Sequence, residues 1–128
     1  MKTLILFSML FLHITDDYYL QGKLALFKQK SWWQENCPDE KYKHDWLIAL
    51  LEHAFSWTFM VMLPIACYMA YTGRTAERFY ITAFLVNMVT HAVTDHLKAN
   101  MFRINLTVDQ CAHIAQVVVT WLVFISVV

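Results

Sequence analysis

Apolar positions gather in four long stretches that contain no Lys, Arg, Asp or Glu. These stretches are residues 3–15, 53–73, 79–94 and 111–128. A soluble domain of this size must cover its surface with polar side chains, so it cannot accommodate four such runs. A lipid bilayer accepts apolar surface, and the pattern therefore predicts an integral membrane protein.

Each apolar stretch extends into a predicted helix close to the length of about twenty residues that crosses the hydrocarbon. Membrane helices tolerate an internal proline such as Pro64. Gly73 is a typical residue to end the second helix, and Thr107 is a suitable N-cap for the last one. The prediction is a single all-α domain, residues 1–128, that forms a four-helix transmembrane bundle. Its helices cover about residues 2–22, 46–70, 79–99 and 108–128.

One sizeable polar segment, residues 22–45, separates the first two predicted helices. Its first part reads KLALFKQKSWW and could form an interfacial amphipathic helix with an aromatic anchor. A mobile solvated loop is the alternative for a segment of this length. The start of the chain imitates a signal peptide but has no small-residue cleavage site after its apolar part, which favours a retained first helix.

Composition supports the membrane prediction and excludes one class of partner. Hydrophobic residues make up 59% of the chain and charged residues 16%, against about a quarter charged in soluble proteins. The formal net charge is zero, so there is no basic field to attract nucleic acid. The three cysteines, Cys37, Cys67 and Cys111, have no paired spacing and are expected to behave as small hydrophobic residues.

The distribution of Lys and Arg predicts the orientation. Cytoplasmic loops of membrane proteins carry the excess of positive charge. The first and third loops have seven such residues, namely Lys23, Lys28, Lys30, Lys41, Lys43, Lys98 and Arg103. The opposite side has three, namely Lys2, Arg74 and Arg78. Both longer loops are therefore placed in the cytoplasm and both termini outside.

Three of the predicted helices carry a His and an Asp four residues apart, so each pair shares one helix face. The second helix adds a single imidazole. In the predicted topology all four sets lie within roughly two helical turns of the same membrane face. Ionisable residues in a membrane span are costly and are functional candidates by default. The candidate metal ligands are His13, Asp17, His53, His91, Asp95, Asp109 and His113.

Imidazole and carboxylate are the usual ligands of zinc, manganese and iron. Four-helix bundles build such sites from facing helices, and an ion would neutralise carboxylates that are costly in the membrane. The sequence thus predicts one divalent metal ion, with room for two; zinc is preferred, and manganese and iron are alternatives.

Two other interpretations use the same residues. Buried His–Asp hydrogen bonds can specify helix packing without a metal, and chains of such groups can relay protons. We expect His44 and His96, in a loop and at a helix end, to be ordinary surface or snorkelling residues. Asp16 is expected to face water at the end of the first helix.

Four motifs in order, HITDDYYLQ, LLEHAF, THAVTDHLK and VDQCAHI, resemble the small bacterial and phage membrane proteins grouped as domain of unknown function 3307. The resemblance covers nearly the whole chain, with Asp16 as an extra acid and a longer, more basic first loop. It implies a polytopic protein of the bacterial inner membrane, often phage-encoded, with a metal site. It also marks three residues beside the ligand candidates, namely Gln21, Lys98 and Gln110.

Two functions follow from these observations. The first is a metal-dependent membrane hydrolase, in which the ion activates water against a lipid-linked or headgroup phosphoester. In this hypothesis Glu52 or a free Asp is the general base and Lys98 holds a phosphate oxygen. The second is a membrane interaction protein that forms a homo-oligomer or binds a host membrane protein, with a structural metal or a polar network.

Overall fold

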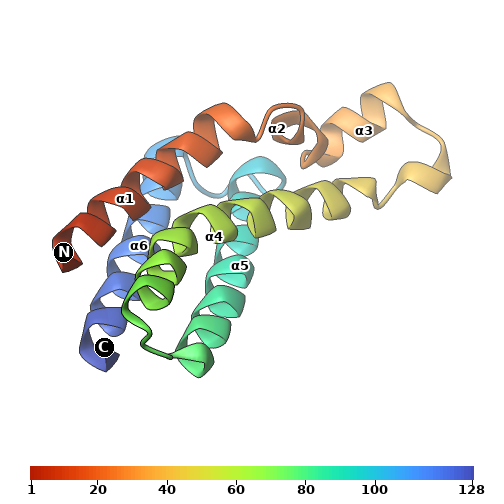
Figure 1. Ribbon diagram of the computed structural model, residues 1–128. Coiled ribbons are helices and arrows are strands. Elements are labelled where there is room, and N and C mark those ends of the chain that lie inside the picture. The colour runs from red at the N-terminus through yellow and green to blue at the C-terminus, as the bar shows by residue number, and fades with distance from the viewer.

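The computed structural model describes all 128 residues and contains helices but no strands (Figure 1). Six α-helices are joined by one π-helical segment, η1, and one 3-10 turn, η2. In chain order the elements are α1 (Lys2–Thr15), η1 (Asp16–Leu20), α2 (Leu24–Phe27), α3 (Lys30–Asn36), η2 (Glu40–Tyr42), α4 (Asp45–Thr72), α5 (Glu77–Ala99) and α6 (Leu106–Val127). The all-α prediction is confirmed.

The four long helices form a ring in which each packs against two others. Helix α4 lies against α1 and α5, and α6 completes the ring by contacting the same two helices. Both chain termini and the α4–α5 turn lie at one end of the bundle, whereas α2 and the α5–α6 connection lie at the other (Figure 1). We call this second end the polar end, because the His and Asp pairs lie toward it.

Local sequence signals explain most helix boundaries. Gly73 ends α4 with a φ of 66°, the left-handed conformation that glycine adopts without strain, and Pro64 lies inside the same helix. The predicted cap Thr107 is wrong. Helix α6 starts at Leu106, and the side chain of Asn105 accepts a hydrogen bond from the Val108 N–H at 2.9 Å. Asn is a stronger N-cap than Thr, and it stands where the helix begins.

Two helices are long and apolar enough to cross a membrane, within Glu40–Thr72 and Leu106–Val127; a core helix of a soluble protein can pass the same test. Helix α1 does not reach that length, because it has only 14 residues before η1 begins. Helix α5 is long enough, but Asn87, His91 and Asp95 lower its hydropathy. By this criterion the structure contains two candidate spans where the sequence predicted four.

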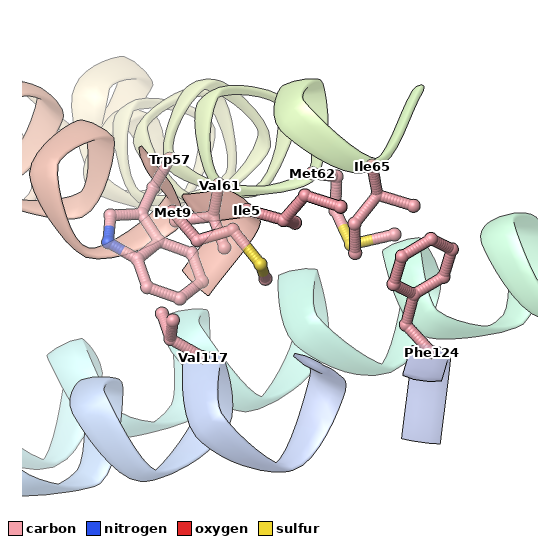
Figure 2. Packing of buried hydrophobic residues seen from close by; sticks show 8 residues of the cluster. All are labelled: Ile5, Met9, Trp57, Val61, Met62, Ile65, Val117 and Phe124. Atoms are coloured by element: carbon pink, nitrogen blue, oxygen red, sulfur yellow. The ribbon is translucent and has the colours of Figure 1, made fainter. Parts of the chain in front are cut away.

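The main apolar core fills the half of the bundle that carries the chain termini, and α1, α4 and α6 contribute to it (Figure 2). Its buried residues are Ile5, Met9, Trp57, Val61, Met62, Ile65, Val117 and Phe124. A smaller cluster of Leu50, Ala54 and Ala92 joins α4 to α5. Trp57 connects this core to the polar end, because its ring contacts imidazoles there.

The first loop forms two short helices where the sequence suggested a single interfacial helix or a mobile loop. The break falls at Gln29, whose extended backbone (φ −97°, ψ 124°) separates α2 from α3. The Asn100 side chain at the end of α5 accepts from the Lys30 N–H at 2.7 Å and donates to the Lys28 carbonyl at 3.0 Å. These two bonds fix the α2–α3 junction against the polar end.

Candidate metal centre

The π-helical segment η1 turns two consecutive carboxylates inward. Asp16 is fully buried and Asp17 is 6% exposed. The Ser56 hydroxyl donates to Asp16 Oδ1 at 2.6 Å. The expectation that Asp16 faces water is therefore wrong, because the wider turn directs both side chains toward α4. Such π segments occur often at functional sites.

A first group of ligand atoms, here called site 1, comes from Asp17, His53, His91 and Asp95. The Nε2 atom of His53 is 3.2 Å from His91 Nε2, 3.4 Å from Asp17 Oδ1 and 3.4 Å from Asp95 Oδ2. His91 Nε2 is 3.8 Å from the same Asp95 oxygen. Ligand atoms around a tetrahedral ion at about 2.0–2.2 Å lie roughly 3.3–3.6 Å apart. The spacing of site 1 is close to that of a metal coordination shell.

A second group, here called site 2, adjoins it on α6. His113 Nε2 is 3.4 Å from Asp95 Oδ1 and 3.5 Å from Asp109 Oδ1. The His113 ring stacks on His91 with 4.1 Å between ring centroids. Asp95 thus faces both groups, one with each carboxylate oxygen. The predicted convergence of the His and Asp pairs on one end of the bundle is confirmed.

Sites 1 and 2, together with the neighbouring Asp16, Lys28 and Lys98, form one polar cluster, in which negative charge exceeds positive charge. Its buried carboxylates are Asp16, Asp17, Asp95 and Asp109. Lys28 Nζ lies 2.5 Å from Asp95 Oδ2, and Lys98 Nζ lies 2.5 Å from Asp109 Oδ2. Four carboxylates facing two ammonium groups leave two negative charges without a counter-ion while the histidines are neutral. One divalent cation would balance them.

Several buried polar atoms of the cluster have no hydrogen-bond partner. They are Asp16 Oδ2, His53 Nδ1, His91 Nδ1 and Asp109 Oδ1. A buried polar atom without a partner costs about 1–3 kcal/mol. His53 Nδ1 and Asp16 Oδ2 face each other at 3.8 Å, so the protein's own hydrogen bonds leave this network incomplete. Gln110 orients one ligand by donating to Asp17 Oδ2 at 2.7 Å, and Gln21 donates to the Asp17 backbone carbonyl.

His13 is buried beside the cluster but is not part of either ligand group. Its Nδ1 accepts a hydrogen bond from the Trp57 indole N–H at 2.8 Å, and its ring centroid is 5.9 Å from that of His113. With Nδ1 accepting, the neutral ring carries its proton on Nε2. The geometry therefore makes His13 a neighbour that packs against the ligands, and its predicted ligand role stays a prediction.

The two residues predicted to be catalytic occupy different surroundings. Lys98 lies at site 2 in its ion pair with Asp109, whereas Glu52 lies on the exposed face of α4. His44 is exposed and His96 stacks on Trp46, with ring centroids 5.2 Å apart. Neither of these two imidazoles joins the cluster.

Lys28 and Trp57 belong to the site but were not predicted from the sequence. Lys28 is 67 residues from its partner Asp95 along the chain and is one of five lysines in a polar loop, so no local pattern distinguishes it. Trp57 stands four residues after His53 and therefore shares its helix face. That spacing was the available signal for a residue in contact with the imidazoles.

The fold and this cluster define an all-α protein with buried His and Asp groups that could hold a metal ion. Comparison of the chain with protein-family models, curated proteins and solved structures gave no match. The resemblance to the domain of unknown function 3307 family thus rests on the motif residues alone and stays a prediction.

Proposed function

We propose that this chain is an integral membrane protein that binds a divalent metal ion at site 1, through Asp17, His53, His91 and Asp95. The observation that carries the proposal is the spacing of the ligand atoms. Two imidazole nitrogens and two carboxylate oxygens from α4, α5 and η1 come together here, with 3.2 Å between the imidazole nitrogens and 3.4–3.8 Å from an imidazole nitrogen to a carboxylate oxygen.

Charge and hydrogen bonding support a cation over a purely structural network. His53 Nε2 and His91 Nε2 face each other at 3.2 Å, so at most one proton can lie between them. Both carboxylates accept hydrogen bonds but cannot donate them while ionised. A bound ion satisfies all four atoms together and balances the two excess negative charges.

The outer surface of the bundle supports the membrane location. Large apolar side chains face outward on all four long helices and are 46–67% exposed: Leu4, Phe7, Phe11, Phe55, Phe59, Ile81, Leu85, Val89, Val119 and Leu122. A monomeric soluble protein rarely exposes apolar patches of this extent, whereas lipid tails accept them. The polar end, with the lysine-rich first loop, is then the cytoplasmic end by the positive-inside rule.

The reaction we propose is hydrolysis of a lipid-linked or headgroup phosphoester. A bound divalent ion lowers the pKa of a coordinated water and so supplies a nucleophile at neutral pH. Lys28 and Lys98 border the cluster and offer ammonium groups to phosphate oxygens. Glu52 is exposed on α4, so the buried Asp16, with a free Oδ2, replaces it in this proposal as the group that accepts a proton.

Complete burial of the ligands favours a second candidate. His53 and His91 are 0% exposed, and closed sites with four protein ligands are typically structural. In this alternative the ion holds the bundle together, and the protein acts by associating with itself or with another membrane protein.

Metal content of detergent-purified protein tests the first proposal. We expect zinc, manganese or iron in the wild type and in the control His44→Ala, which removes an imidazole outside the cluster. The His53→Ala, His91→Ala double variant should lose the site 1 ion while staying helical and monodisperse. Equal metal content in the double variant and the wild type would contradict the proposal.

Release of phosphate or headgroup from phospholipids in mixed micelles distinguishes the two functions. Lys98→Met should lower the turnover rate at least about tenfold if Lys98 holds a substrate phosphate, while the site 1 ion, whose ligands Lys98 does not pair with, stays bound. Metal-dependent folding with no release in the wild type would favour the structural alternative.

A further inference from the structure

The Asp95 carboxylate lies between two sets of ligand atoms. Its Oδ2 faces His53 at 3.4 Å and His91 at 3.8 Å, while its Oδ1 faces His113 at 3.4 Å. A carboxylate can ligate through both oxygens, so the same side chain can serve two ions. This inference rests on the proposed function and specifies the number and arrangement of the metal ions.

Hydrogen bonding around His113 fixes which nitrogen is free. Gln116 donates from its amide nitrogen to the Asn87 carbonyl at 3.1 Å, so its amide oxygen is the atom that faces His113 Nδ1 at 3.2 Å. An amide oxygen only accepts, and His113 Nδ1 must therefore carry the proton of the neutral ring. In the neutral ring the Nε2 atom then carries a free lone pair, as a metal-ligating histidine requires, whereas in the charged ring it donates to the carboxylates.

That lone pair points at two carboxylates. His113 Nε2 is 3.4 Å from Asp95 Oδ1 and 3.5 Å from Asp109 Oδ1, so this nitrogen and the two carboxylates need a positive charge among them, either a proton on Nε2 or a metal ion. Asp109 is fully buried, and its Oδ1 has no hydrogen-bond partner. The unpartnered oxygen is an observation independent of site 1.

We propose that site 2 binds a second divalent cation through Asp95 Oδ1, Asp109 Oδ1 and His113 Nε2, so that Asp95 bridges a two-metal centre. Asp17, Asp109 and His113 also place ligand atoms within 4.8 Å of one another, which makes Asp17 available to both ions. Lys98 holds the other oxygen of Asp109 at 2.5 Å and orients this ligand.

The two sites differ in the number of metal coordination positions that protein ligands occupy. Site 1 has four protein ligands, whereas site 2 has three from Asp95, Asp109 and His113. A metal with three protein ligands retains a position for water or a substrate oxygen, as catalytic sites do. With both ions bound, the four carboxylates and two lysines leave two net positive charges, which suits an anionic phosphoester. In this proposal the ion at site 2 is thus the one that binds the substrate.

Metal stoichiometry in matched variants tests the two-metal centre. Protein purified in detergent is stripped with chelator, reloaded with Mn²⁺, desalted and measured for metal per chain. We expect two ions in the wild type and in His44→Ala, one in His53→Ala, and one in His113→Ala. Asp109→Asn, which keeps the side-chain shape, provides a second site 2 variant if His113→Ala does not fold.

Electron paramagnetic resonance of the same samples reports whether the ions are close. The wild type should show the spectrum of a coupled Mn²⁺ pair, and His113→Ala the hyperfine pattern of isolated Mn²⁺. One ion in the wild type, lost in His53→Ala and kept in His113→Ala, would overturn the second site and leave site 1 standing. Two uncoupled ions would also overturn the bridge, and no bound ion at all would overturn both proposals.

Discussion

Trp57 couples the apolar core to the polar cluster through one hydrogen bond and one stacked ring. Its indole N–H donates to His13 at 2.8 Å, and its ring stacks on His91 at 4.3 Å between centroids. The side chain is fully buried, so neither contact has water as a substitute. Packing from this tryptophan restricts the orientation of a proposed ligand, which is how surrounding residues tune metal sites.

The substitution Trp57→Phe removes the hydrogen bond to His13 but keeps an aromatic ring next to His91. The phenyl ring keeps an aromatic face for His91 but leaves His13 Nδ1 without its donor. We expect the metal-free protein to lose at least about 1–3 kcal/mol of unfolding free energy in detergent, because His13 Nδ1 is left buried without a donor and the smaller ring leaves a void. Chemical unfolding followed by helical circular dichroism measures it.

Metal content of His13→Ala checks the placement of His13. Because His13 lies outside both ligand groups, the amount of bound metal should stay at the wild-type value. Loss of an ion in His13→Ala, with the fold intact, would show that His13 is a ligand, as predicted from the sequence.

Local spacing was enough to predict most of the candidate ligands. His91 shares a helix face with Asp95, and Asp109 shares one with His113. The predicted topology placed all the pairs near the same membrane face, which predicted that they lie close together. Asp16 was misjudged because its inward direction depends on the π segment. Nothing in the apolar pattern indicates that an α-helix widens at that point.

At the scale of elements, the α2–α3 segment delivers a positive charge to the cluster from outside the bundle. Lys28 is 5% exposed, and its ammonium lies 2.5 Å from Asp95 Oδ2, a proposed site 1 ligand. The Asn100 bonds at the α2–α3 junction hold this lysine in place. In the metal-free protein the ammonium partly takes the role of a cation.

Lys28→Met should therefore raise affinity for the site 1 metal. Removing a positive charge next to a ligand oxygen takes away repulsion of the ion, and we expect at least about tenfold tighter binding. The metal-free variant should lose several kcal/mol of stability, because Asp95 is left buried without its partner. Competition with a coloured chelator gives the affinity, and thermal unfolding with and without metal gives the stability.

Lys98→Met is the matched control for this prediction. It also removes a positive charge from a buried carboxylate, but from Asp109 at site 2, so its effect on the site 1 ion should be smaller. Weaker metal binding in Lys28→Met than in the wild type would show that Lys28 supports the site and does not compete with the ion.

Helix positions were predicted well because uninterrupted apolar runs determine them. Helices α4, α5 and α6 begin and end within two residues of the expected bounds. The first loop was harder, because its fold depends on Asn100 and Asp95, which are about seventy residues away along the chain. Sequence periodicity cannot report contacts of that range.

At the scale of the whole molecule, the proposed membrane orientation follows from the different residues at the two ends of the bundle. One end carries the lysine-rich first loop and the cluster, and the other carries both termini and the α4–α5 turn (Figure 1). If the bundle crosses the bilayer, reagents that cannot cross the membrane must reach these two ends from opposite sides.

Single-cysteine variants test this arrangement. One keeps Cys37 in the first loop and replaces Cys67 and Cys111 by serine; the other also replaces Cys37 and adds Thr75→Cys in the exposed α4–α5 turn. We expect an impermeant maleimide to label Thr75→Cys in intact cells and Cys37 only after permeabilisation. The reverse pattern would invert the orientation, and labelling of both from one side would contradict a bundle that spans the membrane.

The central claim is that buried histidines and aspartates of this bundle bind a divalent metal ion. X-ray absorption spectroscopy of the zinc-loaded protein at the zinc edge tests it most directly. The account predicts nitrogen and oxygen ligands at about 2.0–2.2 Å, with imidazole scattering that decreases in the His53→Ala, His91→Ala variant. Sulfur ligands at about 2.3 Å, or an imidazole signal unchanged in that variant, would contradict it.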